Sequence, residues 1–166
     1  WTTDWDGEIS SMVEYAGGGP VAVDGFGNWV STFMTGCSAK DILVGKLDDS
    51  DPSSFQITPI RFGTDDCWVP EADMASDGGN LIFITANPKA ELVRFNTATN
   101  AFTRMAKRYD PTDRSHGISV YNGRVYQTIM SRHQIDVYDK NGAAGSSGTP
   151  PAFIQTLPVG LVAPEL

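Results

Sequence analysis

The 166-residue chain lacks the long apolar run that a membrane-spanning helix needs. Its apolar stretches have the length of Leu81–Ile84, whereas a bilayer requires roughly 18 to 20 residues. Basic residues are also scarce, because 12 Lys and Arg stand against 20 Asp and Glu and leave a net charge of −8. No basic stripe is available to neutralise phosphates. We therefore expect neither a membrane span nor a nucleic-acid partner.

Cysteine is limited to Cys37 and Cys67, which are too few and too far apart for a zinc knuckle. One disulfide between them is plausible in an oxidising compartment, and two unpaired buried thiols are the alternative. The chain begins at Trp1 without an initiator Met or a signal segment, which indicates a processed precursor or a trimmed chain. The favoured location is extracellular or periplasmic.

Helical periodicity is absent as well, and a repeat takes its place. Three short, weakly polar segments each lead to a glycine followed by Asn or Arg. Measured between Asn28, Asn80 and Arg124, the repeat is 52 and then 44 residues long, which is the period of a propeller blade.

Each repeat continues with a β-branched and aromatic run, an alternating strand and a closing strand. Four short antiparallel strands in each repeat predict an all-β fold of propeller blades. The whole chain, 1–166, then forms one propeller segment. Its predicted parts are the end of a preceding blade at 1–18, full blades at 19–62, 72–106 and 116–158, and the first strand of a following blade at 159–166.

Two segments carry a family resemblance. Pro20–Val30 resembles the opening of an NHL repeat, and His116–Tyr126 followed by Ile135–Tyr138 resembles another. The chain is thus similar to six-bladed propellers of the NHL and gluconolactonase-like group, which implies a fold and fixes no activity. A closed ring typically has four to eight blades. This incomplete ring therefore needs partners, either other protein chains or the missing blades of the same polypeptide.

The residues just before the innermost strands of a propeller surround the mouth of its channel. Here they include His116, with Glu71 and Asp73 in the corresponding turn of the preceding blade. An imidazole and two carboxylates could ligate a divalent metal, calcium or zinc, and His116 could act as a general base. In the alternative interpretation, His116 caps its strand by hydrogen bonding and the two acids are solvated.

Two classes of function follow from these patterns. The favoured one is a non-catalytic recognition or assembly module within a larger ring or complex. The other is a lactonase-like hydrolase or lyase with a metal-assisted site formed by Glu71, Asp73 and His116. The sequence leaves open whether the protein is an enzyme.

Overall fold

A computed structural model of the chain describes residues 20–34, 40–46, 56–61, 73–86, 90–106, 110, 112–145 and 152–160. These residues form twelve β-strands and one short 3-10 turn, η1 (Met130–Arg132), and they include no α-helix. The prediction of an all-β fold is therefore confirmed. Within this part of the chain, no helix is long and apolar enough to cross a membrane.

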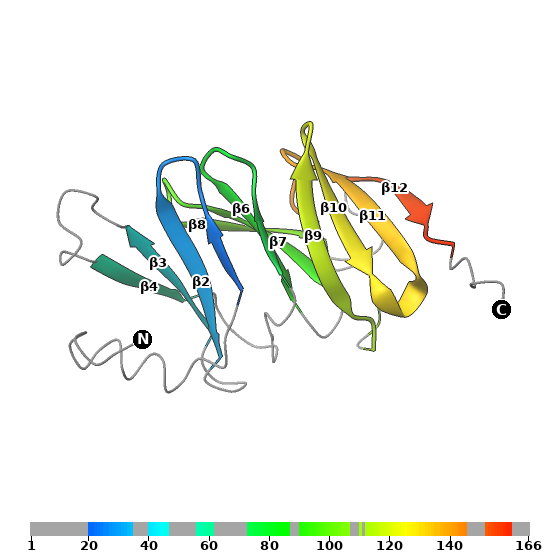
Figure 1. The fold of residues 1–166 in the computed structure, drawn as a ribbon, viewed down its shortest axis with the longest axis horizontal. Helices are drawn as coiled ribbons and strands as arrows, with labels where there is room; N and C mark the ends of the chain where they lie inside the picture. The colour runs from blue at the N-terminus through cyan, green and yellow to red at the C-terminus, as the bar shows by residue number, and fades with distance from the viewer. Residues whose placement is uncertain are drawn as a thin grey trace, which may run out of the picture.

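The strands form three four-stranded antiparallel sheets, each built from consecutive strands (Figure 1). The first sheet contains β1 (Val21–Val23), β2 (Asn28–Met34), β3 (Lys40–Lys46) and β4 (Gln56–Arg61). The second contains β5 (Met74–Ser76), β6 (Leu81–Ala86), β7 (Glu91–Asn96) and β8 (Ala101–Ala106). The third contains β9 (Ser115–Tyr121), β10 (Arg124–Ile129), β11 (Gln134–Asp139) and β12 (Phe153–Pro158).

The turn after the first strand of each sheet follows from local chemistry. In the first two sheets a carboxylate organises it: Asp24 accepts the backbone N–H groups of Phe26 and Asn28, and Asp77 accepts those of Gly79 and Leu81. The third sheet has a two-residue Asn-Gly turn instead. Its Asn122 and Gly123 have φ values of 46° and 74°, which suit the tight turn between twisted antiparallel strands.

These turns correct the alignment of the repeats. Because Asp24 and Asp77 have the same role, Leu81 corresponds to Asn28, and Asn80 does not. The first repeat is therefore one residue longer than the sequence predicts, and the second is one residue shorter. The Gly-Asn pairs are similar in sequence, but the position of the turn carboxylate sets the register.

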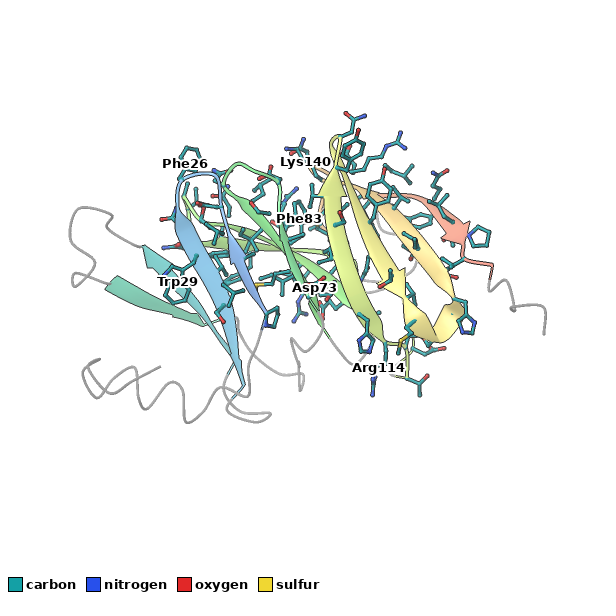
Figure 2. All side chains as sticks on the ribbon, viewed as in Figure 1. Phe26, Trp29, Asp73, Phe83, Arg114 and Lys140 are labelled. Atoms are coloured by element: carbon teal, nitrogen blue, oxygen red, sulfur yellow. The ribbon has the colours of Figure 1, made fainter. Side chains whose placement is uncertain are left out.

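Both faces of the second sheet are covered. In β6, Ile82 and Ile84 belong to a buried cluster with Val30 of the first sheet, whereas Phe83 packs with Val125 of the third sheet. This alternation is the period of a strand with two buried faces, and it explains the uninterrupted apolar run in the sequence. Figure 2 shows Phe83 between the second and third sheets.

The predicted inner, middle and closing strands of all three repeats are present, with boundaries shifted by a residue or two. At the end of the chain, Val159 and Gly160 lie outside any strand, so the strand predicted over 159–166 does not begin at its first residue. Residues 161–166 lie outside the described residues, and so do residues 1–18, predicted as the end of a preceding blade.

Candidate functional site

The first strands of the three sheets lie next to one another. β5 approaches both β1 and β9, and β6 also packs along β9. Asp73 immediately precedes β5, and His116 is the second residue of β9. The sequence prediction therefore placed both residues at the start of a first strand.

Asp73 connects two of these strands. Its Oδ1 accepts the backbone N–H of Met74 at 2.8 Å, and its Oδ2 accepts the N–H of Ile118 at 3.2 Å. The carboxylate thus reaches β9 two residues beyond His116 in the chain, between the second sheet and β9 (Figure 2). Both oxygens accept backbone hydrogen bonds, so Asp73 fixes the position of β9 relative to β5.

The His116 side chain is exposed, and the residue after it is held to the neighbouring strand. The Thr128 Oγ1 atom accepts the Gly117 N–H at 2.7 Å and lies 3.2 Å from the Gly117 carbonyl oxygen, to which it can donate. Thr85 makes the same pair of contacts with the main chain of Asp73 in the second sheet. A repeated threonine therefore anchors the start of these two first strands and leaves His116 facing solvent.

The predicted metal site is only partly within view. Glu71, Cys37 and Cys67 lie outside the described residues, so the Glu71–Asp73–His116 set and the Cys37–Cys67 disulfide stay predictions. Within the described ranges, no three His, Cys, Asp or Glu side chains gather as metal ligands.

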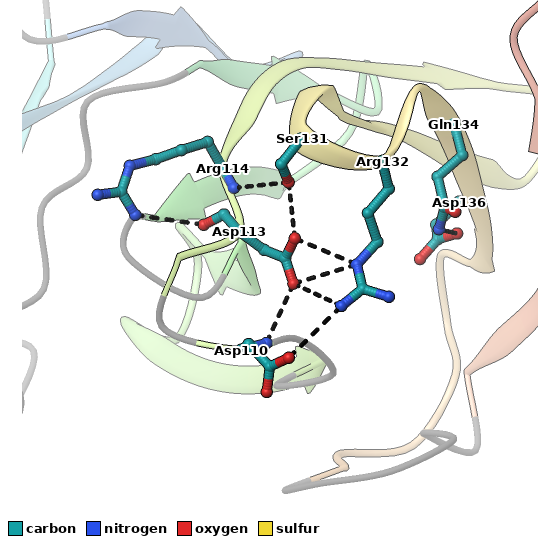
Figure 3. Close-up of polar contacts among 7 residues, drawn as sticks. All are labelled: Asp110, Asp113, Arg114, Ser131, Arg132, Gln134 and Asp136. Atoms are coloured by element: carbon teal, nitrogen blue, oxygen red, sulfur yellow. Dashed lines mark hydrogen bonds and ion pairs between the residues drawn. The ribbon is translucent and has the colours of Figure 1, made fainter.

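A second polar cluster lies just before β9, around η1 (Figure 3). The buried Asp113 carboxylate accepts hydrogen bonds from Ser131 Oγ at 2.7 Å and from Arg132 Nη2 at 2.9 Å. It also accepts the backbone N–H of Asp110 at 3.1 Å. The bonds from Arg132 lower the pKa of Asp113 below its ordinary value, and burial opposes them without reversing the shift. The sequence analysis missed this cluster, although the Asp110–Asp113 segment has the composition of a carboxylate-capped turn.

Polar side chains are also buried between the second and third sheets. Gln127 is fully buried and donates from Nε2 to the Ala90 carbonyl at 2.9 Å and to Ser115 Oγ at 3.2 Å. Its Oε1 atom has no hydrogen-bond partner among the described residues. Asp136, on the adjacent strand, is also fully buried and accepts the Thr156 hydroxyl at 2.7 Å. These contacts fix side chains within the sheet and across the interface.

The turn carboxylates connect each sheet to the next one. Asp24 Oδ2 accepts the hydroxyl of Thr97, which follows β7, at 2.5 Å. Asp77 Oδ2 accepts from Nζ of Lys140, which follows β11, at 2.8 Å. Thr97 and Lys140 occupy the same place in successive sheets, because each follows the residue that pairs with the start of the preceding strand.

Both turn carboxylates have a pKa below the ordinary value. Burial alone raises the pKa of each, but the hydrogen bonds that they accept outweigh it. Asn28 and Thr97 provide the main bonds to Asp24, and Lys140 provides the largest to Asp77. The two carboxylates therefore stay ionised while they connect neighbouring sheets.

Comparison with known proteins adds no family to this description. No family model matches the chain, and no curated protein matches it in sequence. The function is therefore argued from the geometry of the described residues.

Proposed function

We propose that the chain forms consecutive blades of an incomplete β-propeller and acts as a non-catalytic recognition or assembly module. The single observation that carries this proposal is the repeated connection between sheets. Asp24 binds Thr97 and Asp77 binds Lys140 at the same place in successive four-stranded meanders. A stack in which each meander contacts the next through adjacent first strands is the arrangement of propeller blades.

The use of the buried carboxylates supports a non-catalytic role. Asp24, Asp77 and Asp113 each accept hydrogen bonds from backbone groups and from the side chain of another element. Asp136 accepts side-chain bonds within the third sheet. Carboxylates engaged in this way hold turns and sheets in place, so the module offers a rigid surface for a partner.

An extracellular or periplasmic location belongs to the same proposal. It rests on pairing of Cys37 with Cys67, since such disulfides persist in oxidising compartments. The expected partners are other protein chains or further blades of the same polypeptide.

The lactonase-like hydrolase or lyase is the second candidate. The observation in its favour is that the Asp73 carboxylate reaches the strand that carries His116. In that case, Glu71, Asp73 and His116 share a divalent metal.

Metal analysis separates the two candidates. We expect purified protein, dialysed without chelator, to carry no stoichiometric calcium or zinc. We also expect His116→Ala to leave the metal content and the melting temperature unchanged, because the side chain is exposed. His133→Ala is the matched control, since His133 is an exposed histidine in the turn before β11. A stoichiometric metal that His116→Ala removes and His133→Ala retains would contradict the non-catalytic role.

A further inference from the structure

The first sheet presents an apolar face on the side away from the second sheet. This surface, the N-terminal face, consists of Val21, Val23 and Trp29. Val21 is 61% exposed and Val23 is 56% exposed. Figure 2 shows Trp29 on this side of the first sheet.

The same positions are covered in the other two sheets. Val21 and Val23 lie opposite Ser31 and Trp29 on β2. The corresponding pairs are Met74–Ile84 and Ser76–Ile82 in the second sheet, and Ile118–Gln127 and Val120–Val125 in the third. At these positions, Met74 and Ile82 pack toward the first sheet, and Ile118, Val120 and Val125 pack toward the second. The N-terminal face therefore corresponds to a surface that packs against another sheet wherever a preceding sheet is present.

The third sheet presents the complementary surface. This C-terminal face consists of Tyr121, Tyr126, Ile135 and Leu157, whose side chains alternate with those that pack toward the second sheet. Tyr121 is 73% exposed and Leu157 is 37% exposed.

The second sheet shows what the C-terminal face corresponds to. The matching registers of β6–β7 and β10–β11 place Tyr126 and Ile135 where the second sheet has Phe83 and Leu92. Phe83 and Leu92 are fully buried against the third sheet. The C-terminal face thus has the position of a surface that packs against a following sheet.

We propose that a second copy of this chain covers both faces, so that the third sheet of each copy packs on the first sheet of the other. The inference rests on the proposed propeller architecture. Such a head-to-tail contact joins two different surfaces, and it closes into a ring when the rotation between sheets allows it. Two copies of three sheets give six, which lies within the usual range of propeller blades.

The position that connects the sheets favours a second copy as the occupant. Tyr121 follows Val120, the last residue of β9 that faces the second sheet, just as Asp77 follows Ser76, so the third sheet has a tyrosine where the first two have the turn carboxylate. A following sheet with Thr or Lys after its third strand would find no carboxylate there. The residue after β3 of the first sheet is Leu47, at the place of Thr97 and Lys140. A second copy therefore matches a leucine with a tyrosine, and an apolar pair replaces the two polar ones.

Light scattering coupled to size-exclusion chromatography tests this proposal. We expect the wild-type chain to have twice its 17.9 kDa mass. Val21→Asp on one face and Leu157→Asp on the other should each give monomers with unchanged circular dichroism. Phe26→Asp is the matched control, because Phe26 is 69% exposed on the turn between β1 and β2 and belongs to neither face. This variant should stay dimeric.

Mixing the two monomeric variants tests the head-to-tail geometry. One contact in the mixed pair joins two unmodified faces, so a heterodimer should appear in native mass spectrometry of differently labelled chains. A wild-type monomer at all concentrations, a mass that keeps growing with concentration, or a dimer that only one variant disrupts would each overturn the inference. A wild-type monomer would leave the proposed function standing, because further sheets could come from another polypeptide. A stoichiometric metal held by His116 would overturn the proposed function and leave the two-copy assembly standing.

Discussion

Replacing Asp77 with alanine removes the connection between the second and third sheets, and the structure sets the size of the effect. The side chain is 6% exposed and accepts from Gly79 N at 2.8 Å, Leu81 N at 3.1 Å and Lys140 Nζ at 2.8 Å. A net hydrogen bond contributes about 1 kcal/mol, and one to a charged group somewhat more. The Lys140 side chain is 28% exposed and can be hydrated after the substitution, which keeps its share near 1 kcal/mol. We expect Asp77→Ala to lower the free energy of unfolding by about 3 kcal/mol.

A double-mutant cycle isolates the contact with Lys140. Urea denaturation at pH 7 of wild type, Asp77→Ala, Lys140→Met and the double variant should give a coupling energy of about 1 kcal/mol. The matched control is Asp24 with Thr97, which has the same place in the first connection and a neutral donor. Added salt should weaken the Asp77–Lys140 coupling more than the Asp24–Thr97 coupling.

The coupling should also depend on pH in a defined direction. The pKa of Asp77 is below its ordinary value because its hydrogen bonds outweigh the effect of burial, which alone raises it. Its contribution is therefore complete above the unfolded pKa of about 3.9 and is lost as the pH falls through the lower folded value. Additive substitutions within about 0.3 kcal/mol, or a coupling that persists unchanged at pH 2, would refute this account of the connection.

Three further predictions concern other parts of the chain. Asp113→Asn should lower the free energy of unfolding by about 2 kcal/mol at pH 7 and by less in acid, because the Asp113 pKa is depressed; urea denaturation at both pH values checks this, and an equal loss would contradict it. Gly25→Ala should cost about 1 to 3 kcal/mol, because its Cβ meets a main-chain carbonyl of the second sheet, whereas Gly160→Ala, with open space around it, should change the melting temperature little; equal effects would count against the packing of the turns. Cys37 and Cys67 should be unreactive toward a thiol reagent in denatured, unreduced protein, and reduction should cost roughly 3 kcal/mol; two free thiols would exclude the disulfide.

The strands could be predicted from the sequence because their signals are local. Alternating residues such as those of Ile135–Tyr138, and apolar runs such as Leu81–Ile84, identify strands without knowledge of their neighbours. The register of the repeats could not be predicted equally well. The similar Gly-Asn pairs suggested one alignment, whereas the turn carboxylates of Asp24 and Asp77 set another.

The candidate site was predictable only in part. A position at the start of a first strand identified Asp73 and His116. The contacts of Asp77 with Lys140 and of Asp113 with Arg132 join residues far apart in the chain. Such pairs depend on how sheets and turns pack, and no local pattern in the sequence contains that information.

The burial of the second sheet on both faces has a consequence for how the chain unfolds. In a stack, the stability of each sheet is its own plus that of its contacts with immediate neighbours, as in a one-dimensional chain of coupled units. An end sheet can open by breaking one interface, whereas opening the middle sheet breaks two. Backbone amides of β6 and β7 should therefore exchange with solvent most slowly, and loss of structure should spread from the ends of the stack toward its centre.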